Sequence, residues 1–275
     1  MGQFDGQVVF VTGAARGQGR SHALRLAQEG ADIIAVDVCR QVKTVPYPTA
    51  TPDDLAETKR QVKALGRRIV ATEVDVRDLA ALRETVDAAV ADFGRLDIVL
   101  ANAGISVPAP TLEMSEETWS TMIDVNLTGV WKTCAAAVPH IIAGGRGGSV
   151  VITSSLAALK ANANTAHYSA AKAGLVGLMR VLAVELAPQR IRVNTIHPST
   201  VATDMILNDA TYSLFRPDLE HPTRADFEEA ALTLNRLPVP ALESSDLTDA
   251  VLYLVGDSGR YITGTTHTVD AGGQL

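Results

Sequence analysis

The sequence predicts an α/β fold: a doubly wound parallel sheet of seven strands, with helices on both faces. Two observations support this. Short runs rich in β-branched residues alternate along the whole chain with longer runs rich in alanine and leucine. Most of the short runs are almost continuously apolar, which is typical of parallel strands covered on both faces. Regular alternation of strand and helix implies right-handed crossovers, and therefore one sheet between two helical layers.

The strands are expected where the β-branched runs occur. In chain order, these runs are residues 7–13, 31–38, 67–76, 96–104, 148–155, 191–198 and 265–273. Patterns typical of helices lie between them. Gly30, Gly94 and Pro188 mark the ends of three of these helices, because glycine and proline commonly terminate a helix.

We expect residues 1–275 to form a single domain, because no repeat or obvious linker interrupts the alternation. Two proline-bearing segments fit it poorly, at about 39–54 and 205–240. Long irregular segments in a compact fold are often functional, and both should lie where strand carboxyl ends face ligands. We expect the first to be an insertion and the second to be a substrate lid, although either could be plain surface or core.

The composition excludes several classes of protein. A net charge of −7 leaves no positive field for a phosphate backbone, so we expect no nucleic-acid partner. Cys39 and Cys134 have no metal-ligand spacing, so we expect free thiols in a reducing compartment and no metal site. The start of the chain lacks a signal-peptide pattern, and no apolar stretch is long enough to cross a membrane. We therefore expect a cytoplasmic protein.

A glycine-rich turn, TGAARGQG at residues 12–19, joins the first strand to the first helix. Its glycines are Gly13, Gly17 and Gly19. Glycine permits a tight turn, and its missing Cβ lets a pyrophosphate approach the backbone. The helix N-terminus that follows offers free N–H groups and a partial positive charge. A glycine triplet alone is weak evidence, but its place between strand and helix favours a dinucleotide site.

Asp37 ends the second strand, 18 residues beyond Gly19. A carboxylate there can accept hydrogen bonds from the adenosine ribose and would repel a 2′-phosphate, which favours NAD over NADP. Arg16 favours NADP instead, because it could contact the 2′-phosphate. It could equally pair with a surface acid. We give Asp37 more weight because it addresses the discriminating hydroxyl. Asp75, at the end of the third strand, could face the adenine or be an ordinary turn or capping residue.

Tyr168 and Lys172 stand four residues apart in a helical pattern, so their side chains share one face. A nearby ammonium favours the phenolate and would lower the pKa of the tyrosine, which suits acid–base chemistry near neutral pH. Ser155, at the end of the fifth strand, could orient a substrate oxygen or cap a turn, and Ser154 competes for the role. Asn126 lies in a predicted helix, where asparagine is unfavourable, so we expect a specific hydrogen bond.

In order and spacing, these motifs resemble those of the classical short-chain dehydrogenases/reductases over essentially the whole chain. The matching motifs are TGAARGQG at 12–19, NAG at 102–104, Asn126, Ser155 and YSAAK at 168–172. The resemblance implies a Rossmann fold and NAD(P)-dependent oxidoreduction. It also implies the catalytic roles. Tyr168 would exchange a proton with the substrate oxygen, and Ser155 would hold that oxygen. Lys172 would bind the nicotinamide ribose and tune Tyr168, and Asn126 would hold a water in the proton relay.

The resemblance further implies which residues contact the dinucleotide. In chain order they are Gly13, Arg16, Gly17, Gln18, Gly19, Asp37, Asp75, Val76, Asn102, Ala103, Gly104, Tyr168, Lys172, Pro198, Val201 and Thr203. The segment at 197–205 resembles the family's PGxxxT motif, which binds the nicotinamide carboxamide. Ser199 replaces the glycine of that motif, and Ala158 stands where the glycine of SSxxG is usual.

Longer blocks resemble a narrower group, the carveol-dehydrogenase-type enzymes associated with mycofactocin. The blocks include TGAARGQGRSHA, ADIIAVDVC, YPTATPDDLAETKRQV and FRPDLEHPTRADF. The resemblance implies oxidation of secondary alcohols, often cyclic or terpenoid. It implies a tightly held NAD that the insertion covers and that mycofactocin, a peptide-derived redox carrier, reoxidises. Apolar residues in the lid suggest an apolar alcohol. Family habit suggests a homotetramer, and the apolar helix after Lys172 would suit a helix–helix interface.

Two other functions compete with this interpretation. The first is an NADPH-dependent ketoacyl-type reductase, for which Arg16 is the only support. The second is a catalytically silent NAD-sensing regulator, a class that tends to lose the tyrosine–lysine pair or to add a DNA-binding element. The chain keeps Tyr168 and Lys172 and adds no such element. An NAD-dependent alcohol dehydrogenase is therefore the leading interpretation.

Overall fold

A seven-stranded parallel sheet runs through the middle of the molecule, in the order β3-β2-β1-β4-β5-β6-β7. The computed structural model describes residues 2–275. The strands are β1 Val8–Thr12, β2 Asp32–Asp37, β3 Ile69–Glu73, β4 Ile98–Ala101, β5 Gly148–Thr153, β6 Ile191–Pro198 and β7 Thr266–Val269. Neighbouring strands all pair in parallel, as in the register of Val8 with Asp32 in β1 and β2. The predicted Rossmann fold is confirmed.

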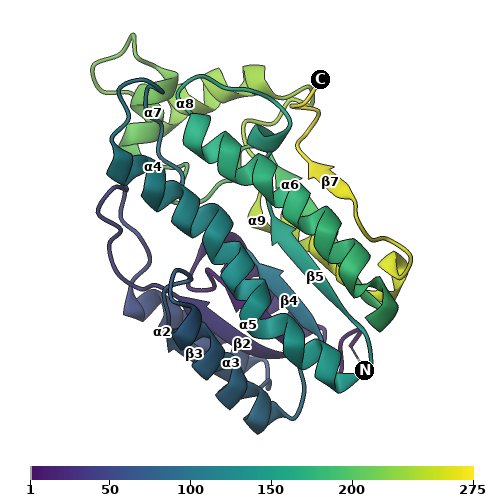
Figure 1. Cartoon of the computed structure of the whole chain (residues 1–275). Coiled ribbons are helices and arrows are strands. Elements are labelled where there is room, and N and C mark those ends of the chain that lie inside the picture. The colour runs from purple at the N-terminus through teal and green to yellow at the C-terminus, as the bar shows by residue number, and fades with distance from the viewer. Residues whose placement is uncertain (1) are drawn as a thin grey trace.

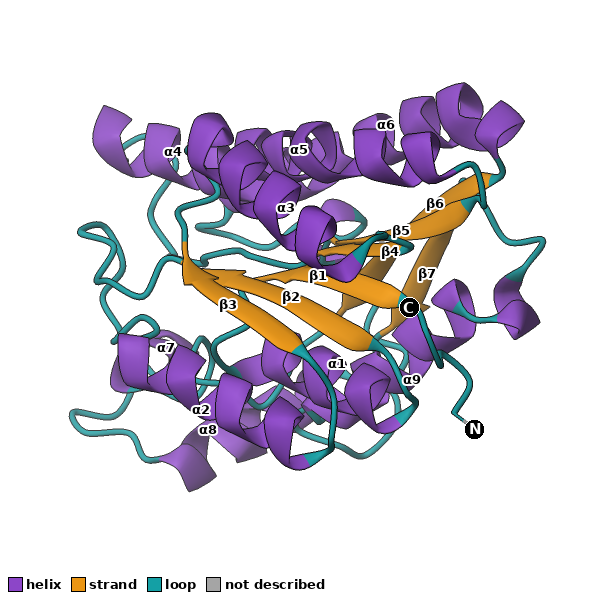
Figure 2. Ribbon diagram, turned by 90° about the horizontal axis from the view of Figure 1, so that it is seen from below, coloured by secondary structure: helices purple, strands orange, loops and turns teal. Residues whose placement is uncertain are grey.

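Helices cover both faces of the sheet (Figures 1 and 2). Their bounds are α1 Gly17–Gln28, α2 Pro52–Ala64, α3 Leu79–Phe93, α4 Glu116–Ile123, α5 Gly129–Gly144, α6 Ala166–Leu186, α7 Asp209–Phe215, α8 Arg224–Ala231 and α9 Ser244–Val255. Helices α3, α5 and α6 lie on one face, and α1, α2 and α9 lie on the other. No helix within residues 2–275 has both the length and the apolarity that crossing a membrane requires.

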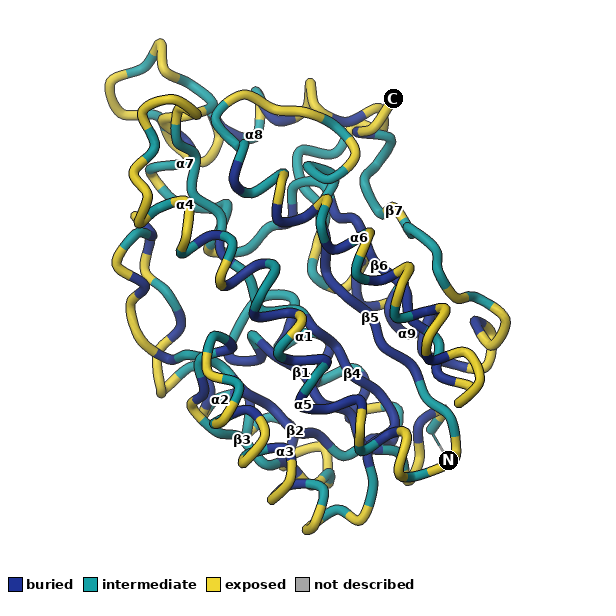
Figure 3. Tube along the Cα trace, viewed as in Figure 1, coloured by how far each residue is buried: buried dark blue, intermediate teal, exposed yellow. Residues whose placement is uncertain are grey.

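The core consists of two apolar layers, one on each side of the sheet. Successive residues of β1 alternate between them, because strand side chains point to opposite faces. Val8 and Phe10 belong to the layer under α3, α5 and α6, whereas Val9 and Val11 face α1 and α9. All four side chains are almost fully buried, as are the central strands in Figure 3.

Helix ends follow the predicted signals. Gly94 caps α3 with a left-handed φ of 79°, and α1 ends just before Gly30, whose φ is 98°. Helix α6 stops at Leu186, and Pro188 lies in the short 3-10 turn that follows. The expected insertion includes the first turn of α2, which starts at Pro52 behind a capping box from Thr51.

The strand order reverses direction beside β1. The chain moves outward through β2 and β3 and then returns to place β4 on the other side of β1. In doubly wound sheets, ligands bind at such a switch point, outside the carboxyl ends of the strands. The glycine-rich turn after β1 and the NAG segment after β4 both lie at this edge.

Candidate active site

One cavity of about 690 Å³ lies at the switch point, and every residue predicted to be catalytic or to contact the cofactor lines it. It is also lined by residues of the insertion, of the turn after β5, of the expected lid and of the chain's last few residues. We call the part beside the glycine turn and Asp37 the cofactor end. The part beside Ser155 and Tyr168 is the reaction end.

The glycine turn leaves no room for side chains. A Cβ on Gly19 would lie 2.0 Å from the carbonyl oxygen of Gly13, and one on Gly13 would lie 2.8 Å from Ala103 Cα. Gly17 has a φ of 56°, in the left-handed region that favours glycine. No side chain caps the first turn of α1, so its backbone N–H groups stay available. This arrangement fits a pyrophosphate.

Asn102 links β1 to β4 at the floor of the cofactor end. Its Nδ2 donates to the Thr12 carbonyl at 3.0 Å, and its Oδ1 accepts from Thr153 Oγ1 at 3.3 Å. Gln18 also lines the cavity, and its Oε1 atom is buried and has no hydrogen-bond partner within residues 2–275. An orphaned polar atom at the cofactor end is consistent with a ligand that completes the site.

Asp37 is held in a fixed orientation at the end of β2. Its Oδ2 accepts from the Ala15 N–H at 2.9 Å, and its Oδ1 accepts from the Val38 N–H at 2.8 Å. Burial raises the pKa of the carboxyl group, although these backbone hydrogen bonds oppose the rise. Each carboxylate oxygen has more than one acceptor site, so Asp37 can still accept from a ribose hydroxyl.

Arg16 pairs with an acid, which was one of its two predicted roles. Its Nη1 lies 2.8 Å from Asp204 Oδ2, and its Nη2 donates to the Pro48 carbonyl. Arg16 therefore ties the glycine turn to the insertion and to the segment after β6. Thr203, next to Asp204, also contacts the glycine turn, because its Cγ2 lies 3.3 Å from where a Gly17 Cβ would be.

Asp75 has partners of its own at the rim of the cavity. Arg77 contacts it at 2.7 Å and Arg40 at 2.9 Å, and the pKa of its carboxyl is lowered because these hydrogen bonds outweigh burial. It does not cap α3, since Asp78 accepts from the Ala81 N–H in that role. Asp75 is thus a turn residue that also lines the cavity.

Further predicted contacts follow strand ends. Val76 is buried after β3 and packs so closely on Gly129 that a Cβ there would lie 2.7 Å from Val76 Cγ2. Pro198 ends β6, and Val201 pairs with Leu242 in an isolated bridge. Ala103 and Gly104 follow β4. A Cβ on Gly104 would lie 2.7 Å from Asn126 Oδ1.

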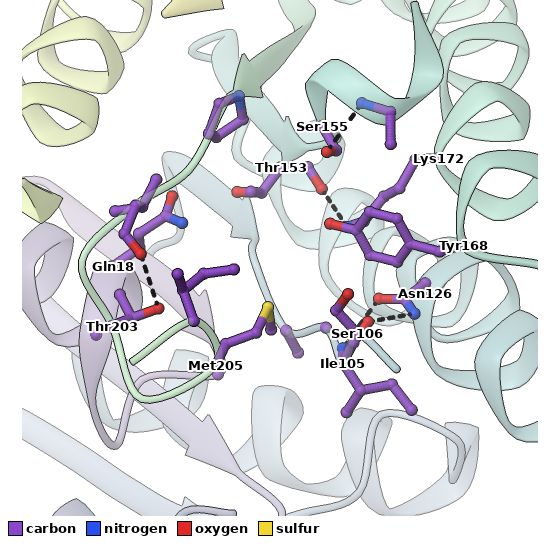
Figure 4. A pocket seen from close by; sticks show the side chains of 18 of the residues that line it. Gln18, Ile105, Ser106, Asn126, Thr153, Ser155, Tyr168, Lys172, Thr203 and Met205 are labelled. Atoms are coloured by element: carbon purple, nitrogen blue, oxygen red, sulfur yellow. Dashed lines mark hydrogen bonds between the residues drawn. The ribbon is translucent and has the colours of Figure 1, made fainter. Parts of the chain in front are cut away.

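Tyr168 and Lys172 project together from the start of α6, with Lys172 Nζ 5.6 Å from the centre of the tyrosine ring (Figure 4). The Lys172 ammonium donates to the Thr153 carbonyl at 2.8 Å. Burial lowers the pKa of Lys172 to about 7. Burial also raises the pKa of Tyr168, opposed by a hydrogen bond with Ser155.

The expected lowering of the Tyr168 pKa is therefore wrong for the protein by itself. The prediction treated Lys172 as a fully charged neighbour on a helix surface. In the fold, Lys172 is buried and Tyr168 is partly buried, so desolvation disfavours the ammonium and the phenolate alike. Tyr168 is consequently held as a neutral phenol, the form that can donate a proton.

The two serines after β5 have different roles. Ser154 is buried, and its Oγ donates to the Lys172 carbonyl at 2.9 Å, which fixes α6 against the sheet. Ser155 lines the cavity beside Tyr168, and its Oγ accepts from the Ala157 N–H at 3.1 Å. Ser155 therefore caps the short turn and also faces the reaction end. His197 Nδ1 lies 2.9 Å from the Ser155 carbonyl oxygen and holds its backbone.

Asn126 makes the specific hydrogen bonds that its position predicted. Its Oδ1 accepts from the Ile105 N–H at 3.1 Å, and its Nδ2 donates to the Ile105 carbonyl at 3.0 Å. It does not lie in an ordinary α-helix, because residues Asp124–Thr128 form a π-helical turn between α4 and α5. Such wide turns are frequent at functional sites.

The insertion contacts the reaction end of the cavity as well as the cofactor end. Val42, Val45 and Tyr47 are buried in an apolar cluster with residues from α4 and from the segments that follow β3 and β4, and Tyr168 packs against that cluster. The Tyr47 hydroxyl accepts from the Ser106 N–H at 3.3 Å. A cover over the cofactor end was expected, but contact with the reaction end was not. No sequence signal links residue 47 to residue 106.

Sequence reasoning also missed residues at the reaction end. Lys160, Asn164, Leu234, Asn235 and Gly273 all line the cavity. They come from three distant segments, and none lies in a motif. Lys160 stands only five residues after Ser155 in the sequence, and this was the one signal that it could line the cavity. Within residues 2–275, no cluster of histidine, cysteine or carboxylate side chains is arranged to hold a metal ion.

Comparisons with known proteins agree with this geometry. A family model described as short chain dehydrogenase matches residues 7–211. The chain is 57% identical to a (-)-trans-carveol dehydrogenase of Rhodococcus erythropolis, over 100% of both sequences. A structure of carveol dehydrogenase from Mycobacterium avium in complex with NAD superposes with a TM-score of 0.98 at 54% identity, over 99% of each chain. A short chain dehydrogenase from Mycobacterium paratuberculosis bound to NAD gives 0.91 at 43% identity, also over 99% of each.

Proposed function

The chain belongs to the short-chain dehydrogenase/reductase family, in its carveol dehydrogenase-like branch, and from that premise we propose its function. It is an NAD-dependent alcohol dehydrogenase that moves a hydride between a secondary alcohol and the corresponding ketone. The observation that carries the proposal is the single cavity, which joins the glycine turn and Asp37 to Asn126, Ser155, Tyr168 and Lys172.

The cofactor end fits NAD. The open N-terminus of α1 and the Cβ-free surface of Gly13 and Gly19 would hold the pyrophosphate. Asp37 would accept from the adenosine ribose, and Lys172 would donate to the nicotinamide ribose. The segment from Pro198 to Thr203 would hold the carboxamide. When bound, NAD supplies the hydride acceptor, and the protein supplies orientation and charge.

The reaction end manages the proton. The Tyr168 hydroxyl exchanges a proton with the substrate oxygen, and Ser155 orients that oxygen by hydrogen bonding. Since burial keeps Tyr168 neutral, its phenol donates directly when a ketone is reduced. Alcohol oxidation requires the phenol to give up its proton first, toward Lys172 and a water that Asn126 would hold.

An apolar substrate fits the walls of the reaction end. Met205, Ile206, Leu214, Phe215 and Leu234 line it, all from the expected lid. Apolar walls with a few polar groups favour a cyclic or terpenoid alcohol. The name of the 57% identical relative, a carveol dehydrogenase, supports the same substrate class.

We further propose that NAD is held tightly and is reoxidised in place by mycofactocin. Two features support enclosure of the cofactor end. Arg16 bridges Pro48 of the insertion and Asp204 across the glycine turn. The buried side chains of Val42, Val45 and Tyr47 anchor the insertion over the cavity. A cofactor under such a cover would leave slowly, so an external carrier would have to collect its electrons.

A spectrophotometric assay tests the proposal. A panel of cyclic secondary alcohols is supplied with NAD, with NADP, and with an artificial electron acceptor. We expect turnover with the artificial acceptor, which would reoxidise the bound NAD, and little turnover with added NAD or NADP alone. Activity with NADP alone would favour the ketoacyl-type reductase instead. That alternative loses support because Arg16 is occupied by Asp204 and Pro48. Binding of NAD without any turnover would favour the regulator.

A further inference from the structure

Lys160 is a cation of the cavity for which the proposed reaction has no use. The other cations that line the cavity all have a partner. Arg16 and Arg77 form ion pairs with acids. Lys172 binds the Thr153 carbonyl and flanks Tyr168. Lys160 has only a backbone carbonyl, and residues 2–275 place no carboxylate within 4.0 Å of its Nζ atom.

The fold brings Lys160 to the reaction end. Beyond Ser155, the chain makes the short 3-10 turn Leu156–Ala158, and the Lys160 N–H donates to the Leu156 carbonyl at 2.9 Å. The Lys160 Nζ atom then donates to the Gly273 carbonyl at 2.6 Å. Leu156, Lys160 and Gly273 all line the cavity. The ammonium is therefore anchored on the wall that begins at Ser155.

The anchored ammonium has unused hydrogen-bonding capacity. A lysine ammonium carries three donors, and Gly273 takes one of them. Lys160 is only partly buried. The remaining donors can reach an acceptor that enters the cavity, and a carboxylate is the acceptor that binds an ammonium most strongly.

We propose that Lys160 binds a carboxylate of the substrate. The inference rests on the proposed function and narrows its substrate class. The reacting hydroxyl would lie at Tyr168 and Ser155, an apolar skeleton would contact Leu156 and the lid, and a carboxylate would meet Lys160. The substrate is then a hydroxy acid with an apolar ring or chain between its two polar groups. A neutral alcohol such as carveol would fill the apolar part and leave Lys160 without its ligand.

A matched pair of alcohols tests this directly. The probes are 4-hydroxycyclohexanecarboxylate and its methyl ester, which share one ring and one hydroxyl and differ in charge. With the wild-type protein, we expect a KM for the acid about tenfold to a hundredfold lower than for the ester, the range typical of a hydrogen bond to a charged group.

Lys160→Met should remove that preference by raising the KM of the acid, while its kcat and both constants of the ester stay within about twofold. Lys160→Arg should restore the preference, because it retains the charge. Lys63→Met, which removes an exposed lysine of α2, is the control and should change neither substrate. If Lys160→Met weakens acid and ester equally, Lys160 only fastens the turn to Gly273 and the proposal is overturned.

A binding measurement separates this inference from the proposed function. Calorimetric titration of cyclohexanecarboxylate into the NAD-loaded protein needs no turnover. We expect binding to wild type and a loss of about tenfold or more in Lys160→Met. Equal binding to both proteins overturns the carboxylate site, even if the ester is oxidised. Oxidation of neither alcohol, with charge-dependent binding intact, would count against the reaction and not against Lys160.

Discussion

Burial decides the protonation of the central pair at the scale of single residues. Lys172 is 3% exposed, and its pKa falls to about 7. Tyr168 stays a phenol because its pKa is raised. The same burial that makes the charged forms costly lowers the local dielectric, which strengthens hydrogen bonds to a reacting oxygen.

Tyr168→Phe should abolish turnover and leave cofactor binding intact. Phenylalanine keeps the ring that packs on the insertion's cluster and removes only the hydroxyl. We expect kcat to fall by at least about a hundredfold, the usual contribution of an acid–base group. Titration of the cofactor-stripped protein with NADH, followed by NADH fluorescence, should give an unchanged Kd. Retained activity would refute the tyrosine mechanism.

Lys172→Met should change how stability depends on pH. In the folded cofactor-free protein the pKa of Lys172 is about 7, against an ordinary value of 10.5. Between these values the unfolded chain binds more protons, so stability rises with pH. The destabilisation from burying the charge is complete below about pH 7 and fades toward pH 10.5. In urea unfolding at pH 6, 8 and 10, the free energy of unfolding of the wild type relative to that of the methionine variant should increase as the pH rises.

At the scale of elements, contacts between segments that are distant in sequence hold the cofactor end of the cavity together. The glycine turn, the insertion and the segment after β6 are far apart in sequence, and Arg16 joins all three. Proline and the packed side chains Val42 and Tyr47 stiffen the insertion. The insertion is therefore anchored by its packed side chains, and Arg16 is the residue that links it to the glycine turn and to the segment after β6.

Arg16→Ala and Asp204→Asn should accelerate cofactor exchange. Each removes one side of the bridge that closes the glycine turn, so bound NAD should leave faster. Wild type should retain NAD through desalting, and the variants should lose a larger fraction. Arg25→Ala, which breaks an exposed ion pair with Asp249 on the outer surface, is the matched control. Wild-type protein that elutes free of cofactor would contradict the trapped-NAD proposal.

Exposed apolar side chains on one helical layer mark a candidate assembly face at the scale of the whole molecule. Trp131 on α5 is 47% exposed, and Val181 and Val184 on α6 are 55% and 76% exposed. Both helices belong to one layer (Figure 2). Val181 and Val184 stand three residues apart on one side of α6, and apolar side chains left in solvent favour association. The homotetramer, the single domain and the lid at 205–240 stay predictions.

Val184→Glu should weaken the assembly without unfolding the chain. A charge on this face would have to be desolvated on association. Light scattering should give four times 29.0 kDa for wild type and a smaller mass for the variant. Leu65→Glu, on an exposed residue after α2 in the opposite helical layer, is the control and should not change the mass. A wild-type monomer would contradict the tetramer.

The sequence by itself determined the fold class, and it predicted the glycine turn, Asp37 and the Tyr168–Lys172 pair that line the cavity. Strand runs, the glycine turn and the spacing of Tyr168 and Lys172 are local patterns, and local geometry follows from them. Only the tertiary structure decided which serine hydroxyl binds the Lys172 carbonyl, which partner Arg16 takes and in which direction the pKa of Tyr168 moves. It alone joined Lys160 to Gly273. These outcomes depend on burial and on contacts between distant segments, which packing creates and no short stretch of sequence contains.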